Sequence, residues 1–231
     1  MSEIILMSDP RVAAVPVREC GERLIDVREA TDLLVDSRQL PDSGPSFTLL
    51  REGVLRRLVR AEALLPHGLR LLFVEGYRRP ALQRRYFEEY AGQLRDLWPS
   101  RTAAEIHAAA ARYVSPPDIA PHSAGAAVDL TLADADGREL DLGTRLDADP
   151  EESEGACYTE AANIGVEARA RREILGAALT GAGLVNYPTE WWHWSYGDRY
   201  WALSSGAESA LYGPSDEDAK GSRGPSDAVS G

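Results

Sequence analysis

Two short stretches, far apart along the chain, each set a histidine close to an acid. Residues 187–194 (YPTEWWHW) place an acid and an imidazole three positions apart among three tryptophans. Residues 121–129 (PHSAGAAVD) add a second histidine and a second acid. The four groups are of the kinds that hydrolytic zinc centres use. A fold that builds such a centre must bring the two stretches together, with the rest of the sequence as its scaffold.

Residues 121–129 offer two ligands within a short distance. The small residues between His122 and Asp129 let the backbone turn tightly and approach an ion closely, so that both side chains can point at it. His193 supplies a third ligand. The set then has two imidazoles and one carboxylate, with a fourth position open for water, as catalytic zinc requires. We therefore expect these three residues to hold the metal.

Glu190 is better suited to be a base than a ligand. A carboxylate beside a metal-activated water can accept its proton and pass it to the leaving amine. In a regular strand Glu190 and His193 point to opposite faces, so their convergence requires a bend, which we predict at Pro188-Thr189. Taken alone, Glu190 could be an exposed strand acid. The three expected ligands favour the catalytic role.

The length and composition indicate one domain. A chain of 231 residues with 44% hydrophobic and 27% charged residues is typical of a globular protein with a single substantial core. From Gly213 onward, Ser, Gly, Asp and Pro dominate and little can be buried. We predict one domain over residues 1–213 and a disordered tail over residues 214–231.

Charge and hydropathy exclude several kinds of partner. The formal net charge of −12 repels a phosphate backbone, so nucleic acid is not an expected partner. No segment approaches the roughly 18 apolar residues of a membrane span, and the first residues lack the basic start of a secretory signal. We therefore expect a cytoplasmic protein that does not bind a membrane. We also expect it to be monomeric or weakly homo-oligomeric.

Hydrophobic periodicity predicts an α+β domain. Strands in hairpins, with helices between other segments, indicate an antiparallel sheet flanked by helices. The N-terminal segment reads as irregular with one or two short strands. The later elements are expected as a helix from beyond Pro45 to about Pro66, a strand over 69–75, helices over 80–97 and 102–112, a strand over 127–132 with a turn at 133–137, an acidic loop over 143–154, a helix over 159–180 and a strand over 184–187.

The two motifs carry a specific resemblance. His122-Ser-Ala-Gly-Ala-Ala-Val-Asp129 followed by Glu190-Trp-Trp-His193 resembles the signature of the zinc D-alanyl-D-alanine dipeptidases of the vancomycin-resistance type, within the wider family of zinc D,D-peptidases. The resemblance runs from about Leu69 to Tyr212 and takes in Gly76-Tyr77-Arg78, Leu142-Gly143-Thr144 with Asp147, and Tyr212-Gly213-Pro214.

The resemblance implies a fold and an activity. The fold is the single α+β catalytic domain of the zinc D,D-peptidases, which is hedgehog-like. The activity is hydrolysis of a small dipeptide, D-alanyl-D-alanine or a related D-amino-acid dipeptide. The resemblance also links the chain to cell-wall peptides and to antibiotic resistance. The biological role could be resistance, wall-peptide recycling or biosynthesis.

The resemblance also assigns residues. One Zn²⁺ per chain is held by His122, Asp129 and His193, and Glu190 is the general acid/base. Asp147 matches the family acid that binds the substrate's free ammonium group. A carboxylate there selects for a dipeptide and against longer chains. The alternative for Asp147 is one more acid in an acidic surface loop.

An arginine of the family stabilises the oxyanion of the tetrahedral intermediate. The family has Tyr-Arg-Pro at that place, whereas this chain reads Tyr77-Arg78-Arg79-Pro80. We assign the role to Arg78, because it directly follows the tyrosine at the strand end, and keep Arg79 as the alternative. A fixed guanidinium aimed at developing negative charge can contribute roughly 3 kcal/mol. A surface arginine that only opens a helix is the other interpretation.

Two departures from the family concern the substrate. A family region resembling Asp26-Val27-Arg28 continues with a tyrosine that lines the pocket and then an Asn-Phe pair, where this chain has Glu29 and Leu33-Leu34. The family serine two places before the first ligand is Ala120 here. Both changes affect substrate contacts and not the metal. We therefore expect zinc binding to be kept and the preference for D-alanyl-D-alanine itself to change.

Other mechanisms have less support. A serine enzyme of this specificity uses a Ser-x-x-Lys pair, and the only lysine is Lys220, in the predicted tail. Cys157 has no nearby base in the sequence that could activate it. The remaining alternatives keep the zinc: a D,D- or L,D-carboxypeptidase-like enzyme acting on another wall or natural-product peptide, or a non-catalytic recognition module. The presence of both Asp129 and Glu190 disfavours the module.

Overall fold

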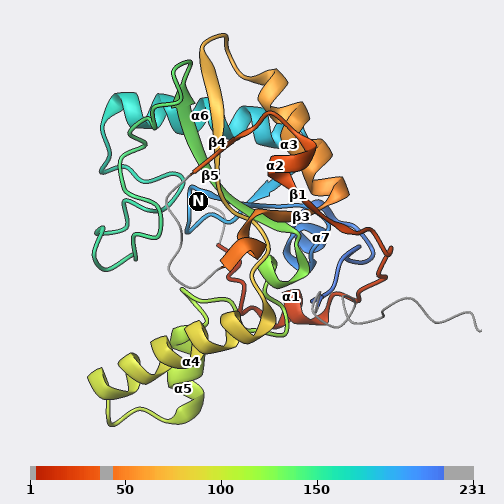
Figure 1. Cartoon of the computed structure of the whole chain (residues 1–231). Helices are drawn as coiled ribbons and strands as arrows, with labels where there is room; N and C mark the ends of the chain where they lie inside the picture. Colours follow the sequence, from red (N-terminus) through yellow and green to blue (C-terminus); the bar gives the residue numbers. More distant parts are fainter. Residues whose placement is uncertain (1–3, 37–43, 216–231) are drawn as a thin grey trace, which may run out of the picture.

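The apolar segments at residues 69–75 and 127–132 form neighbouring antiparallel strands at the centre of a five-stranded sheet (Figure 1). The computed structural model describes residues 4–36 and 44–215. The strands are β1 (Leu24–Asp26), β2 (Leu34–Val35), β3 (Leu49–Arg51), β4 (Leu69–Glu75), β5 (Ala127–Asp134), β6 (Val185–Asn186) and β7 (His193–Ser195). The helices are α1 (Pro10–Ala14), α2 (Val27–Ala30), η1 (Gly44–Thr48), α3 (Glu52–Leu64), α4 (Pro80–Leu97), α5 (Ala103–Ala110), η2 (His122–Ala124), α6 (Val166–Gly181) and α7 (Arg199–Ser205).

The strand order in the main sheet is β2-β4-β5-β7-β6, and a small second sheet pairs β1 with β3. All pairs in the main sheet are antiparallel except β2 with β4. The chain leaves β2 and returns to β4 by a crossover that includes α3, and such a connection joins parallel strands. The expected α+β domain with flanking helices is confirmed, and the sheet expected as antiparallel is mixed at this edge.

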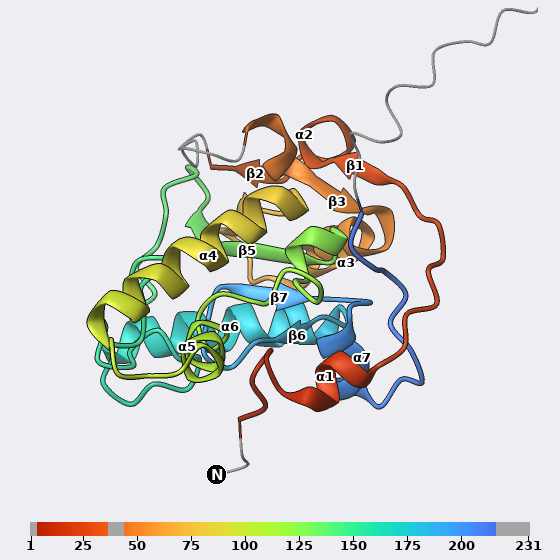
Figure 2. The same ribbon diagram turned by 90° about the horizontal axis from the view of Figure 1, so that it is seen from below.

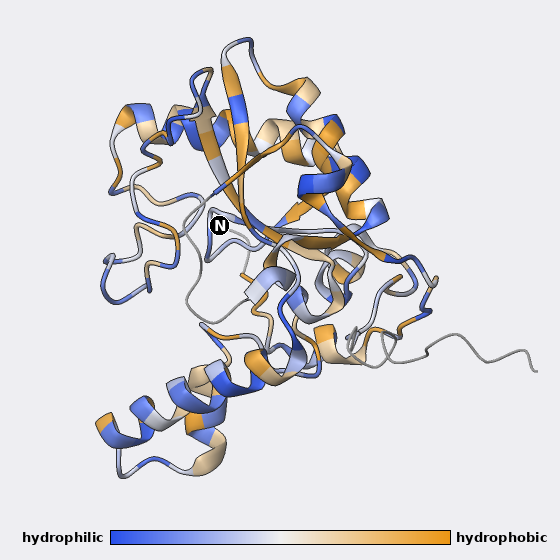
Figure 3. Ribbon diagram, viewed as in Figure 1, coloured by the Kyte–Doolittle hydropathy of each residue, from blue (hydrophilic) through white to orange (hydrophobic). Residues whose placement is uncertain are grey.

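One face of the main sheet is closed by α3 and α6, which contact each other. Figure 1 shows α6 passing behind β4 and β5, and Figure 3 shows that these strands are mainly hydrophobic. The amphipathic α3 faces the sheet with its apolar side, as its helical spacing predicts. The buried side chains of this core include Leu55, Leu58, Leu71, Phe73, Val128, Leu130, Leu175 and Leu179.

A β-bulge near the end of β4 decides what lies on the other face. Phe73 packs in the hydrophobic core, yet two residues later Glu75 pairs with Asp129 of β5 after a shift in register. Val74 is the extra residue, and it reverses the side-chain alternation so that Glu75 leaves the core face. Asp129 also lies directly opposite His193 of β7. Directly opposed residues share a face, so one row of polar side chains crosses three strands.

Two predicted helices begin later than expected. Residues 49–51, included in the helix expected beyond Pro45, form β3 and pair with β1, and α3 begins at Glu52. So short a strand has no periodicity that distinguishes it from a first helical turn. The helix expected from Thr159 begins at Val166.

The delayed start of α6 has a cause in Arg172. Its buried guanidinium donates three hydrogen bonds of 2.7–2.9 Å to main-chain carbonyls of the preceding loop, those of Leu142, Ala156 and Tyr158. These contacts satisfy backbone oxygens that no helix or strand pairs. They hold the expected acidic loop as a series of turns up to Gly165, the N-cap of α6.

Helices α4 and α5 form a hairpin that projects from the sheet (Figures 1 and 2). Helix α4 begins at Pro80 as predicted, and a capping box between Thr102 and Glu105 opens α5. The pair has its own apolar cluster, centred on Phe87 and Ile106. The hairpin therefore has a small core of its own, and residues of α4 line the same cavity as the row of polar side chains.

The C-terminal end is described only in part. Ser215 N donates to the carbonyl of Ser123 at 2.9 Å, which places the end of the described chain near η2. The rest of the tail predicted over residues 214–231 lies outside the described residues. Within residues 4–36 and 44–215, no helix is long and apolar enough to cross a membrane.

Candidate active site

His122 opens the short helix η2, and its ring orientation is fixed by the backbone. Gly125 ends η2 with a φ of 65°, and a Cβ there would lie 2.2 Å from the side chain of Leu24, so the turn needs glycine. Nδ1 of His122 lies 2.6 Å from the carbonyl oxygen of Gly76. A carbonyl only accepts, so Nδ1 carries the proton and Nε2 presents its lone pair to the site.

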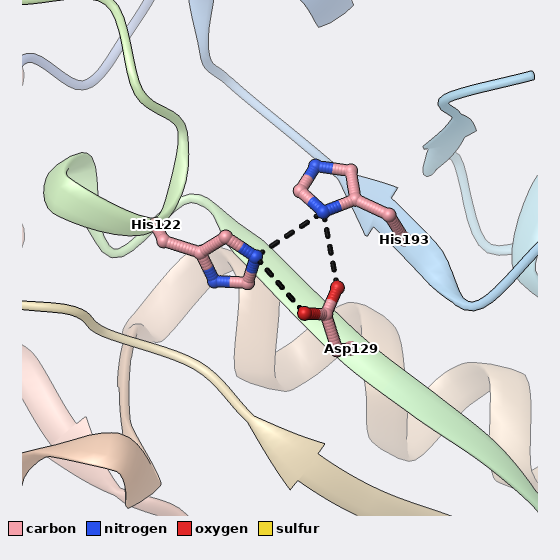
Figure 4. Close-up of side chains that lie close together, drawn as sticks. All are labelled: His122, Asp129 and His193. Carbon is pink, nitrogen blue, oxygen red and sulfur yellow. Dashed lines mark hydrogen bonds and ion pairs between the residues drawn. The ribbon is translucent and has the colours of Figure 1, made fainter. Parts of the chain in front are cut away.

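One nitrogen of each histidine and the two oxygens of Asp129 face one another in the row (Figure 4). His122 Nε2 lies 3.2 Å from His193 Nδ1 and 3.3 Å from Asp129 Oδ2. His193 Nδ1 lies 3.0 Å from Asp129 Oδ1. Tetrahedral ligands at about 2.0–2.1 Å from zinc are ~3.3 Å apart. One nitrogen of each histidine and one carboxylate oxygen of Asp129 lie within 4.8 Å of one another, which is close enough for one ion to bind all three. All three side chains are buried, and their donor atoms form a group that could hold a metal ion.

The charges of the donor set also favour a cation. Burial tends to raise the pKa of Asp129, but His122 and His193 outweigh it and hold that pKa far below its ordinary range. Burial opposes charge on His122, yet the Asp129 carboxylate raises the pKa of this imidazole. Without a metal, this raised pKa means that a second proton on the His122 ring stabilises the Asp129 carboxylate. A divalent cation can replace this proton with the donors already in place.

Glu190 lies beside the donors in the turn between β6 and β7. Its N–H donates to the carbonyl of Tyr187 at 2.9 Å, and the N–H of His193 donates to the carbonyl of Glu190 at 3.2 Å. This turn is the bend predicted at Pro188-Thr189. One carboxylate oxygen of Glu190 lies 3.8 Å from His193 Nδ1. Burial raises the pKa of Glu190 to about 7, although the nearby His193 opposes the rise.

Asp147 lies at the mouth of the site on the acidic loop. Its φ of 57° is left-handed, which is uncommon for a residue other than glycine. Tyr113 Oη and Arg145 Nη1 both donate to its carbonyl, at 3.0 and 3.2 Å. The residue as a whole is exposed, but partial desolvation of its carboxylate and the charges of Asp129 and Glu75 raise its pKa above the ordinary value.

These raised pKa values predict how the stability of the metal-free protein changes with pH. Between the ordinary value of 4.5 for Glu190 and its raised value of about 7, the folded chain holds a proton that the unfolded chain has released. The free energy of unfolding therefore falls as pH rises through that window. His122, with a pKa raised from 6.5, acts in the same direction, since its stabilising charge is lost as pH rises.

We expect the Tm of chelator-treated protein, followed by circular dichroism, to fall from about pH 4.5 to pH 7, because the folded-state pKa of Glu190 lies at the upper end of that range. Glu190→Gln should make the decline smaller, since the amide does not titrate. A Tm that rises across this window would contradict the assignment.

Arg78 reaches the site from the end of β4 and is held on two sides. Its guanidinium forms a two-point ion pair with Glu75, with Nε 2.9 Å from Oε1, and Nη1 donates to Gln83 Oε1 at 3.0 Å. Gln83 in turn donates to the carbonyl of Ser115 at 2.8 Å. Burial opposes the charge of Arg78, but Glu75 outweighs it and raises the pKa. Arg79 is the N-cap residue of α4 and is not among the described residues that line the cavity.

A cavity of about 370 Å³ opens over the donor atoms. Ala120 lines it, as expected for the position of the family serine. Trp192 lines it too, whereas Trp191 turns away and donates to Thr144 Oγ1 at 2.8 Å, so one tryptophan of the pair faces the pocket. The expected pocket position of Glu29 is wrong: this side chain is exposed on α2 and is not among the described lining residues.

Comparison with known proteins connects this geometry to a family. The sequence model described as D-ala-D-ala dipeptidase matches residues 26–205, which is most of the chain. The chain belongs to the D-ala-D-ala dipeptidase family. The resemblance of its motifs is thereby confirmed, as is the prediction of a peptidase at the level of the family.

Two relatives of this family member carry the name D-alanyl-D-alanine dipeptidase. The one from Synechocystis sp. is 29% identical over 216 residues, which cover 82% of this chain and 87% of the relative. The one from Escherichia coli K12 is 39% identical over 72 residues, which cover 31% of this chain and 35% of the relative.

Among solved structures, the chain is similar to a mutant of the vancomycin resistance D,D-pentapeptidase VanY from a VanB-type resistance cassette, in complex with Zn(II). The TM-score is 0.34 and the identity is 20%, over 78% of this chain and 88% of that chain. So distant a likeness supports no conclusion about the site of this family member.

The structure of this D-ala-D-ala dipeptidase family member adds site residues that sequence reasoning missed. Glu75 and Gln83 hold Arg78, and Tyr113 supports Asp147. Glu75 could have been noticed in the sequence, because it is a charged residue at the end of an otherwise apolar, buried strand. Gln83 and Tyr113 lie on a helix and in a loop with no pattern that marks them.

Proposed function

We propose that this chain is a zinc-dependent dipeptidase that hydrolyses a small D-amino-acid dipeptide, D-alanyl-D-alanine or a close relative. The observation that carries the proposal is the buried cluster of two imidazole nitrogens and the Asp129 carboxylate, which are close enough together to hold one metal ion, with the carboxyl group of Glu190 beside them. Membership of the family and the names of two relatives support the substrate class.

His122, Asp129 and His193 would hold one zinc ion per chain. When bound, zinc would activate a water molecule and polarise the peptide carbonyl. Glu190 would accept the proton of the attacking water and deliver it to the nitrogen of the leaving amine. Burial makes the carboxyl group of Glu190 a better proton acceptor than an exposed glutamate, which suits it to both steps.

Arg78 would stabilise the carbonyl oxygen as it gains negative charge. Its bonds to Glu75 and Gln83 use three of its five N–H groups and leave one on each terminal nitrogen for the substrate. The same bonds fix the guanidinium before substrate arrives, so no reorganisation is needed during the reaction.

Asp147 would bind the free ammonium group of the dipeptide. It lies at the mouth of the cavity, where a carboxylate can pair with the amine of a short peptide and disfavour one with a longer N-terminal extension. N-acetyl-D-alanyl-D-alanine, which lacks the ammonium group, distinguishes this role from the carboxypeptidase-like alternative. We expect the free dipeptide to be hydrolysed and the acetylated one to resist hydrolysis.

We infer that the cavity has room for a dipeptide side chain larger than alanine. Two alanines have only two methyl groups to place, whereas a volume of about 370 Å³ lies within the range of pockets for larger ligands. Beyond the donors, α4 lines the cavity with Tyr86 and Tyr90, and Ala120 leaves room where the family has a serine. Aromatic walls suit an apolar or aromatic substrate side chain.

A dipeptide panel tests the proposed function, with configuration and side-chain size varied at both positions and released amino acid as the readout. We expect D,D-dipeptides to be cleaved and L,L-dipeptides to resist. At least one D,D-dipeptide with a large side chain should have a higher kcat/KM than D-alanyl-D-alanine. Tyr90→Ala should lower kcat/KM for that dipeptide more than for D-alanyl-D-alanine, because Tyr90 lines the cavity beyond the donors. Zinc-loaded protein that binds these dipeptides yet releases no amino acid would support the recognition module instead.

The cellular setting forms a separate part of the proposal. A cytoplasmic location fits a role on free dipeptides and stays a prediction. So do the monomeric or weakly oligomeric state and the link to cell-wall turnover or antibiotic resistance.

A further inference from the structure

The ring of His193 has one nitrogen that the proposed metal site does not use. Nδ1 faces the other donors, while Nε2 is buried and has no hydrogen-bond partner in the described part of the chain. A metal-binding histidine almost always donates its second N–H to a carboxylate, a carbonyl or a water. Nε2 of His193 therefore needs an acceptor on its own side of the ring.

Asp198 has the complementary atom. It is the N-cap residue of α7, and its Oδ1 accepts from Trp201 N at 2.7 Å and from Ser195 Oγ at 3.1 Å. Its Oδ2 is buried and has no partner among the described residues. The whole residue is only 2% exposed, so bulk water does not reach this oxygen. Burial raises the pKa of Asp198, and the nearby His193 acts against that rise.

The local geometry puts the two groups on the same side of the sheet. His193 and Ser195 are two positions apart on β7, so their side chains share one face. Ser195 binds Asp198, which brings this carboxylate to the face that carries the His193 ring. The other nearby acids are on the far side of the ring: oxygens of Asp129 and Glu190 lie 3.0 and 3.8 Å from Nδ1.

We propose that Asp198 is a positioning residue for the metal centre, which accepts a hydrogen bond from Nε2–H of His193 through Oδ2, either directly or through one water. This bond keeps the proton on Nε2 and leaves the lone pair of Nδ1 directed at the metal. The same carboxylate caps α7 through Oδ1, so the helix fixes the carboxylate and the carboxylate fixes the ring. The inference rests on the proposed zinc site.

Asp198→Asn tests the proposal. Asparagine still caps a helix, but its amide nitrogen can take the place of Oδ2 and oppose the N–H of His193. Asp9→Asn is the matched control, because Asp9 also caps a short helix, α1, through the N–H of Arg11 at 2.8 Å. The measurement is zinc affinity, by competition with a chromogenic chelator.

We expect Asp198→Asn to weaken zinc binding by about 10- to 100-fold and Asp9→Asn to leave it unchanged. Nitrogen-15 NMR of the zinc-loaded wild-type protein should show a proton on Nε2 of His193, shifted by its hydrogen bond to a carboxylate. If Asp198→Asn does not fold, Asp198→Ser keeps a capping side chain and the NMR measurement needs no variant.

Each outcome decides the matter. Wild-type zinc affinity in folded Asp198→Asn, or a His193 proton on Nδ1, would mean that Asp198 only caps α7. A wild-type protein that binds zinc tightly without cleaving any dipeptide would overturn the proposed function and leave this inference intact. A wild-type protein that binds no zinc would overturn both.

Discussion

Glu190→Gln should lower kcat by about 10²- to 10⁴-fold while the protein keeps its zinc. Glutamine has nearly the shape of glutamate, but its amide neither accepts the proton of the attacking water nor returns it to the leaving amine. Glu190 is not one of the three proposed ligands, which are His122, Asp129 and His193, so Glu190→Gln removes no ligand. Steady-state kinetics and metal analysis of the same preparation give both quantities.

Glu167→Gln is the control for this experiment. Glu167 is exposed on α6 and is not among the described residues that line the cavity. It should have wild-type kinetics. Turnover retained in zinc-loaded Glu190→Gln would remove Glu190 from the mechanism. Loss of zinc together with activity would instead make Glu190 a ligand.

Arg78→Ala should lower kcat by about 10²- to 10³-fold, the effect of removing a preorganised oxyanion donor. The guanidinium is fixed by Glu75 and Gln83 and lines the cavity. In the proposed mechanism its loss removes the charge that stabilises the oxyanion. KM should change less than kcat, because the interaction forms mainly in the transition state.

Arg79→Ala is the matched control, since Arg79 is the neighbouring residue and lies outside the described lining of the cavity. It should keep most of the activity. A large fall in kcat for Arg79→Ala and a small one for Arg78→Ala would reverse the assignment. Glu75→Gln adds an intermediate case, because it loosens Arg78 without removing it.

Local signals were sufficient for several elements. Pro80 at the first position of α4 and the capping box at Thr102 of α5 each depend on residues close in sequence. The turn at Pro188-Thr189 was predictable because Glu190 and His193 cannot share a side in a regular strand. The proposed ligand set followed in the same way, from residue types that zinc prefers and from small residues that let the chain turn.

Other features depend on contacts between distant segments. The bulge at Val74 shifts Glu75 to the site face, and alternation along β4 alone predicts the opposite face. Arg172 delays the start of α6 by binding carbonyls of the preceding loop. Neither contact leaves a periodic pattern in the sequence. The opposite happened at Glu29. The resemblance placed this residue in the substrate pocket, but it is not among the described residues that line the cavity.

Zinc titration of chelator-treated protein tests the central claim most directly. Hydrolysis of the best D,D-dipeptide would be measured as Zn²⁺ is added to a known concentration of chain. The proposed site, with His122, Asp129 and His193 as ligands, predicts no activity without zinc, a linear rise, and a plateau at one zinc per chain. Hydrolysis that persists without zinc, or that does not appear when one zinc is bound, would contradict it.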